Sequence, residues 1–315
     1  MVSRPHSIIA ILFAFMLCSG GVDVSFSSQE WLLPTNDICG MFSLGVNKFL
    51  LEGTTVVNDG SVFSEVLNVT KVNEIADCAK KFGTSMSLLL WTDDYPFDEC
   101  SRSTFNFTTL KHQLQSYVTQ YDVDEVTFWI WVGNCQQFSW QIARKIGWII
   151  RTKLRTRLGK SLRASLGFAA EPFDSPLWQY IRPARLGRYY NTISVHFGSP
   201  GVVDSRAVDD RFARAVVERL VTLGISPRRI ELSVAAQGYQ KLTLQPSTYF
   251  ELSKKGAPPF SNGYFEDYVY QSQQQVVEKT HLIEERGLRG FSLQTVDFDL
   301  PVKNRSSLLY AALYY

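Results

Sequence analysis

Short apolar segments alternate along the chain with longer stretches in which apolar residues recur at helical spacing. The clearest short segment runs from Val126 to Val132, between an acidic cluster and Gly133. β-branched and aromatic residues fill it, and it is too short for a convincing helix, so it predicts a strand buried on both faces. We expect this strand to be the centre of the fold.

Similar runs predict seven further strands, at residues 37–44, 48–57, 85–91, 162–169, 191–197, 229–236 and 290–296. Helical spacing predicts the connections, at residues 63–82, 107–121, 135–158, 177–188, 208–223, 271–285 and 306–313. Strands and helices that alternate over about 270 residues favour an α/β fold of the closed (β/α)₈ TIM-barrel type. No G-x-G-x-x-G follows a strand, which argues against a dinucleotide-binding sheet.

Composition and charge describe an ordinary globular protein, with 45% hydrophobic residues and a formal net charge of +2. The near-neutral balance gives no reason to expect nucleic acid as a partner. One basic run stands out, and its cations are interleaved with apolar residues as on the solvated face of an amphipathic helix. It comprises Arg144, Lys145, Arg151, Lys153, Arg155, Arg157 and Lys160.

Residues 1–27 are predicted to be a signal peptide, with a positive Arg4, an apolar core from Ile8 to Leu17 and small residues after it. The core is too short to span a bilayer, and no later stretch is long and apolar enough, so no membrane span is expected. The mature chain would be a single secreted barrel over residues 28–315.

Secretion makes disulfides possible, and removal of Cys18 with the signal leaves an even number of cysteines, with three possible connectivities. Expected positions in the barrel favour Cys39 with Cys78, at the bottom, and Cys100 with Cys135, at the top. The cysteine spacing is not that of a zinc site, and no metal or cofactor is expected. Glycosylation sequons occur at Asn68, Asn106 and Asn304.

Five segments in order resemble the motif strands of family-18 glycoside hydrolases, the chitinase and chitinase-like family. They are VDEVTFWIW (123–131), LRASLGFAAEP (162–172), YYNTISVHFGSPG (189–201), SPRRIELSVAAQGYQ (226–240) and GLRGFSLQTVDFD (287–299). The variant that the chain resembles most is the chitinase domain-containing, stabilin-interacting chitinase-like subgroup. About 35 residues separate the seventh strand from the next helix, so we expect no α+β insertion domain.

The resemblance implies a substrate-assisted hydrolysis in which a carboxylic acid at the end of the fourth strand protonates the leaving oxygen. In the family motif DxxDxDxE, Asp124 matches the first Asp, Thr127 replaces the second, Trp129 replaces the third, and Trp131 stands at the acid position. An indole does not titrate near neutral pH and cannot act as this acid. A register shift of one residue brings no acid to the face either.

Other positions of the family pattern are also changed. His196, Gly198 and Ser199 replace Met, Tyr and Asp on the sixth strand, and Gln237 and Gln294 replace an aromatic residue on the last two. His196 is interpreted as a hydrogen-bonded core or mouth residue in preference to a ligand. Candidate residues for a barrel-mouth site are Trp91, Trp129, Trp131, Glu171, His196, Gln237 and Gln294. Trp129 and Trp131 either stack on a sugar or fill the barrel centre.

Three functions remain open. The first is a catalytically inactive chitinase-like barrel that binds an N-acetylated glycan or a protein receptor. The second is an active glycosidase with displaced acids, for which Glu171, Asp297 and Asp299 are candidates at the C-terminal face. The third is a secreted structural or surface antigen without a pocket ligand.

Overall fold

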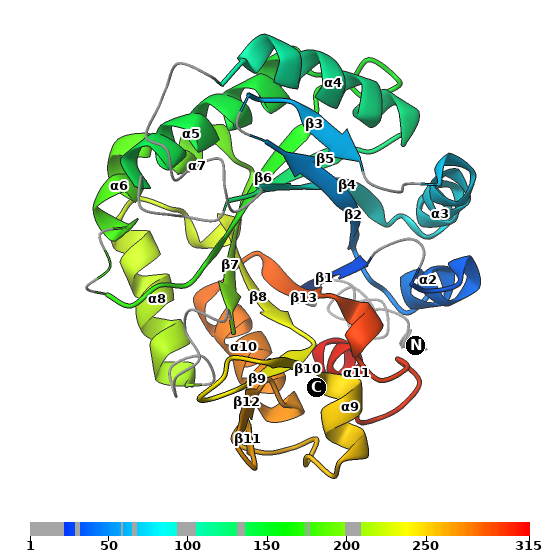
Figure 1. Ribbon diagram of the computed structural model, residues 1–315, viewed down its shortest axis with the longest axis vertical. Coiled ribbons are helices and arrows are strands. Elements are labelled where there is room, and N and C mark those ends of the chain that lie inside the picture. The colour runs from blue at the N-terminus through cyan, green and yellow to red at the C-terminus, as the bar shows by residue number, and fades with distance from the viewer. Residues whose placement is uncertain are drawn as a thin grey trace, which may run out of the picture.

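Eight parallel strands form a closed ring with helices around its outside, which confirms the predicted (β/α)₈ barrel (Figure 1). The computed structural model describes residues 22–28, 32–57, 59–64, 68–92, 105–130, 136–173, 175, 177–198 and 209–315. In chain order the barrel strands are β1 (Asp23–Ser28), β2 (Lys48–Val56), β4 (Ser85–Thr92), β5 (Glu125–Trp129), β6 (Arg163–Ala169), β7 (Thr192–Phe197), β8 (Ile230–Ala235) and β13 (Gly290–Gln294).

The outer layer consists of helices that return the chain from one strand to the next. They are α2 (Thr35–Phe42), α3 (Val69–Phe82), α4 (Phe107–Gln120), α5 (Gln136–Lys153), α6 (Leu177–Ala184), α7 (Leu186–Tyr189), α8 (Asp210–Thr222), α10 (Gln273–Arg286) and α11 (Leu308–Tyr314), with 3₁₀ turns η3 (Pro227–Arg229) and η4 (Val296–Phe298). Gly83 ends α3 in the left-handed conformation (φ 71°), as its position after the periodic stretch predicts. Within the described ranges, no helix has both the length and the apolar character needed to cross a bilayer.

One strand prediction at the beginning of the chain is wrong. Residues 37–44 belong mainly to helix α2, because a short apolar stretch does not by itself separate strand from buried helix. The first barrel strand is β1, which lies largely inside the predicted signal peptide of residues 1–27. Its alternation of Val24 and Phe26 with serines is that of a strand, so the barrel begins at Asp23 and not after residue 27.

The segment between β8 and α10 is as short as expected but contains more structure than a loop. Its four short strands form an antiparallel sheet in the order β10-β9-β12-β11, beside the barrel in the lower part of Figure 1. These elements are β9 (Gln237–Gln240), β10 (Pro246–Thr248), α9 (Tyr249–Lys254), β11 (Tyr264–Phe265) and β12 (Tyr268–Tyr270). A further short strand, β3 (Val62–Ser64), pairs with β2 in antiparallel fashion.

The main hydrophobic core lies between the strands and the helices. Outward-facing residues such as Phe26, Phe128 and Val195 are fully buried in it. The alternate residues point into the barrel, where most TIM barrels have bulky branched side chains. Here they include seven buried serines: Ser25, Ser27, Ser87, Ser165, Ser194, Ser233 and Ser292. The barrel interior is therefore unusually polar.

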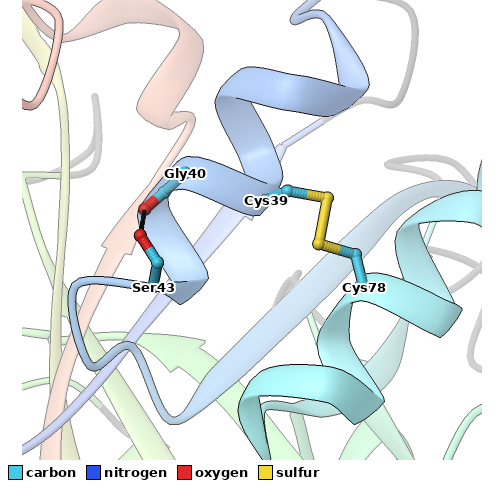
Figure 2. Close-up of a disulfide and its surroundings, with 4 residues drawn as sticks. All are labelled: Cys39, Gly40, Ser43 and Cys78. Carbon is cyan, nitrogen blue, oxygen red and sulfur yellow. Dashed lines mark hydrogen bonds between the residues drawn. A yellow bond between two sulfur atoms is a disulfide. The ribbon is translucent and has the colours of Figure 1, made fainter.

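The predicted disulfide between Cys39 and Cys78 is present (Figure 2). It joins α2 to α3, with the two Cα atoms 5.8 Å apart, and so links the first two helices of the outer layer. The predicted pair Cys100 and Cys135 lies outside the described residues. Asn68 and Asn106, two of the three sequon asparagines, are exposed N-caps, and their side chains accept hydrogen bonds from the first turns of α3 and α4.

A polar barrel interior with a tryptophan at its upper end

Strand β5 presents Glu125, Thr127 and Trp129 to the barrel interior, the face that the family motif assigns to its acids. The Thr127 and Ser87 hydroxyls share a hydrogen bond of 2.7 Å. Trp129 is 3% exposed and packs with Leu50, Leu89 and the half-buried Trp91. Of the two roles considered for it, Trp129 thus fills the barrel centre. Trp131, at the position of the family acid, lies outside the described residues.

Space for the Trp129 ring comes from the neighbouring strand. Gly167 pairs with Trp129 in the β5–β6 register, and a Cβ added to Gly167 would lie 2.1 Å from Trp129 Cε3. The ring centroids of Trp91 and His196 lie 5.1 and 5.5 Å from that of Trp129. Trp129 Nε1 is buried without a hydrogen-bond partner. An aromatic cluster therefore occupies the upper barrel, below the C-terminal face where TIM-barrel sites form.

Below this cluster, the interior holds an ionic network. Lys48 Nζ lies 3.0 Å from Glu231 Oε2 and 3.5 Å from Glu125 Oε1. Ser165 Oγ donates to Glu125 Oε1 at 2.6 Å. Burial opposes ionisation of Glu125, but the Lys48 and Arg163 charges outweigh it and lower the pKa of Glu125. Burial likewise opposes protonation of Lys48, and the two glutamates outweigh it and raise its pKa.

A cavity of about 210 Å³ opens at this N-terminal end of the barrel. Lys48, Glu125 and Glu231 line it from within, together with Arg163 at the start of β6 and Arg289 just before β13. Positive and negative side chains balance around it. The N-terminal end of a TIM barrel usually serves stability and not catalysis. We therefore interpret this network as the floor of the barrel.

His196 ends β7 inside the barrel and is 7% exposed. Its Nδ1 lies 3.3 Å from Ser233 Oγ. Burial, together with the nearby Lys279 charge, lowers the pKa of His196 to about 3, so the imidazole is neutral at physiological pH. Gln294 at the end of β13 is also buried. These two predicted mouth residues therefore belong to the interior wall.

Two carboxyl groups, Glu52 and Asp297, interact electrostatically near the C-terminal ends of β1 and β13. Glu52, on the inward face of β2, is 5% exposed, and its Oε1 has no hydrogen-bond partner. Burial raises its pKa to about 7; a hydrogen bond with Ser27 opposes this shift and the charge of Asp297 adds to it. Asp297 accepts a hydrogen bond of 2.6 Å from Ser28 Oγ. A buried carboxyl group whose pKa is raised towards neutrality thus lies near the C-terminal end of β1.

The other candidate carboxylates differ in their surroundings. Burial raises the pKa of the half-buried Glu171, which follows β6. Asp299 is buried and accepts hydrogen bonds from Ser307 Oγ, Leu308 N and Leu309 N, so it anchors the start of α11. Both carboxylate oxygens of Asp299 are engaged in these contacts, and burial raises the pKa of Asp299 to about 6.

Gln237 lies just above the barrel, at the start of β9. It is half-buried and accepts a hydrogen bond from the Tyr239 hydroxyl at 2.9 Å. The described residues bring no three His, Cys, Asp or Glu side chains together in a way that would hold a metal ion. Ser199 lies outside the described residues.

The sequence analysis missed Glu52 and the network of Lys48, Glu125 and Glu231. A signal was present, because Lys48, Glu52 and Glu231 lie within predicted strands and Glu125 directly precedes one. Lys48 and Glu52 are also four residues apart, on one face of β2. Charged residues inside predicted strands, spaced by an even number, would have indicated a polar barrel interior.

Neither a scan against family models nor a search of curated proteins finds a match to the sequence. Solved structures do match. The GH18 chitinase ChiB from Flavobacterium johnsoniae has a TM-score of 0.69 at 12% identity, with 94% of each chain covered. A chitinase from Bacteroides thetaiotaomicron has a TM-score of 0.75 at 11% identity, covering 93% of this chain and 96% of that one.

A class V chitinase from Nicotiana tobaccum in complex with NAG4 has a TM-score of 0.70 at 11% identity, covering 93% of this chain and 98% of its own. These similarities cover nearly the whole length of both chains. Because the sequence identity is low, they show the fold alone. The chain thus folds as the (β/α)₈ barrel of GH18 chitinases.

Proposed function

We propose that the chain is a secreted chitinase-like barrel that binds an N-acetylated glycan at its mouth and does not hydrolyse it by the family mechanism. It would stand with the stabilin-interacting chitinase-like subgroup that its motif strands resemble. The observation that carries the proposal is the inward face of β5, where Thr127 and Trp129 occupy positions of the family's acids.

Two further features support binding without chemistry. Trp91 is half-buried above the buried Trp129, so part of an aromatic ring remains available at the mouth end. Aromatic rings of this kind offer apolar faces to sugar rings. The Nicotiana tobaccum chitinase with the same barrel fold has been solved with the chitooligosaccharide NAG4. A neutral oligomer of N-acetylglucosamine is therefore the first ligand to test.

The test is calorimetric titration of the intact secreted protein with chitohexaose, in parallel with a glycan array. We expect binding, and we expect Trp91→Ala to weaken it about tenfold through the loss of one stacking surface. Phe82→Ala is the matched control, since Phe82 is an exposed aromatic residue at the outer end of α3. Equal loss in both variants, or no binding of any N-acetylated glycan, would contradict the proposal and favour a protein receptor or a surface role without a pocket ligand.

A second candidate is an active glycosidase with displaced acids, and Glu52 is the observation that favours it. Its carboxyl group has a pKa near 7 and a hydrogen-bond-free oxygen, and the charge of Asp297 acts on it. A general acid needs such a pKa near its working pH. Release of product from chitin oligosaccharides that is abolished in Glu52→Gln but kept in Glu171→Gln would establish this second function in place of the first.

A further inference from the structure

The charge of the chain is distributed unevenly. Residues 136–190 contain eleven Lys and Arg against two Asp and Glu, whereas the whole chain carries a net charge of only +2. This segment comprises α5, the turn after it, β6, α6 and α7. A single-sign excess of this size on neighbouring elements creates a local field that attracts anions.

Helices α5, α6 and α7 of this segment lie on one side of the barrel, where α5 packs against α6 and α7 (Figure 1). Two contacts hold these helices together: Arg151 Nη1 donates to the Arg188 carbonyl at 2.7 Å, and Arg144 lies 5.4 Å from the centre of the Tyr189 ring. We define the basic surface by six exposed residues: Lys145, Lys153, Arg157, Lys160, Arg182 and Arg185.

No carboxylate among the described residues pairs with these six cations. None of the six has an Asp or Glu oxygen of the described ranges within 4.0 Å. Cations elsewhere are paired, as Lys80 is with Asp122 at 2.6 Å and Arg214 with Asp210 at 2.6 Å. Exposed charges without a partner keep their attraction for anions in solution, especially at low salt.

The dimensions of the basic surface fit an extended polyanion. Lys145 and Lys153 are separated by about 12 Å along the α5 axis, given a rise of about 1.5 Å per residue. Arg157 and Lys160 continue the strip in the turn after α5. On α6 and α7, a cavity of about 290 Å³ is lined by Arg182, Arg185 and Arg188. Guanidinium groups bind sulfate and phosphate oxygens in pairs, so this cavity suits one charged group of a longer chain.

Two observations separate the classes of polyanion. The Trp148 ring is already engaged by Lys145 and Lys153, 4.4 and 5.1 Å from its centre, so it does not offer a free platform for stacking a base. Leu158 is 79% exposed in the turn, but one apolar side chain is a weak anchor for a membrane. We propose that the basic surface binds an extended sulfated polysaccharide. The preference for a polysaccharide over nucleic acid also rests on the proposed secretion of the protein.

The experiment measures binding of the intact protein to a heparin dodecasaccharide at several salt concentrations. We expect binding that weakens steeply with salt. The triple variant Lys153→Gln, Arg157→Gln, Lys160→Gln should raise the Kd about tenfold or more and make the log–log salt slope shallower by about two to three. The control variant Lys241→Gln, Lys254→Gln, Lys255→Gln removes the same charge from exposed lysines near α9 and should change neither quantity.

Several results would overturn the proposal: no heparin binding at low salt, equal loss in both triple variants, or tighter binding at matched charge to duplex DNA or to vesicles rich in phosphatidylserine. A Leu158→Ser variant should bind heparin normally; loss of vesicle binding in it would favour a membrane. Chitohexaose titration of the same variants keeps the two proposals apart, because mouth binding should persist when heparin binding is lost.

Discussion

Gly167 and Trp129 occupy complementary positions on adjacent strands, such that a Cβ at residue 167 would lie 2.1 Å from the indole. The ring has little freedom to move, because Trp91, Leu50 and Leu89 surround it. The Trp129 ring is therefore accommodated by the absence of a side chain on the next strand.

This relationship predicts the effect of Gly167→Ala. Overpacking of a closed core costs about 1–3 kcal/mol, and we expect that loss in the free energy of unfolding measured in urea. Gly40→Ala is the control, because its Cβ would meet nothing within 4 Å in helix α2 and alanine favours helices. In a double-mutant cycle with Trp129→Leu, the two losses should not add. Additive losses would show that the contact does not determine the packing.

The ionic floor of the barrel predicts a large cost for Lys48→Met. Removing this cation leaves Glu231 and Glu125 buried with a partner missing, so we expect a loss of about 3–5 kcal/mol. Adding Glu231→Gln to Lys48→Met should recover part of it. Lys80→Met breaks the exposed pair with Asp122 and should cost less than about 1 kcal/mol. Similar losses in the two single variants, measured by chemical unfolding, would contradict a buried network.

Glu52 predicts a pH dependence of stability. Its pKa is about 7 in the folded protein against an ordinary value of 4.5, so the folded state binds this proton more tightly. The resulting stability is complete below about pH 4.5 and is lost as the pH rises towards 7. Glu52→Gln cannot ionise, so at pH 8 it should be more stable than the parent by about 3 kcal/mol, with the difference vanishing near pH 4.5.

Unfolding curves at both pH values check this expectation. Glu74→Gln, at an exposed position on α3, should show no such difference. A constant offset between Glu52→Gln and the parent at both pH values would show that the pKa of Glu52 is not raised in the folded barrel.

The disulfide predicts a redox-dependent melting temperature. Cys39 and Cys78 are 39 residues apart, and closing a loop of that size is worth about 4 kcal/mol in the chain-entropy model. The double variant Cys39→Ser, Cys78→Ser should therefore melt at a lower temperature than the oxidised parent. Reductant should lower the melting temperature of the parent more than that of the double variant, because the double variant already lacks this disulfide.

The barrel itself was predictable because each strand and its return helix have their own local pattern. Strand β5 is buried on both faces and therefore has an unbroken apolar run. Helix α3 is buried on one face, so its apolar residues recur at helical spacing. Strand β1 was missed because its serines resemble the small residues that follow a signal core. Only the register with β2 and β13 reveals that these serines face the interior.

The candidate site was less predictable than the fold. The family pattern placed Thr127 and Trp129 on the correct face of β5, because side chains alternate along any strand. It did not indicate the role of Glu52, which depends on burial and on Asp297 about 245 positions later in the chain. The closure of the barrel determines which distant residues act on Glu52, and the local spacing of apolar and polar residues does not encode this.

The position of β1 between β13 and β2 also limits how the chain can be matured. A protease that cut after residue 27 would remove nearly the whole strand and open the ring of parallel strands between β13 and β2. Open edges of parallel strands pair with other chains and promote aggregation. Cleavage that preserves the barrel must therefore occur before Asp23, so the fold itself sets the latest processing point compatible with a stable product.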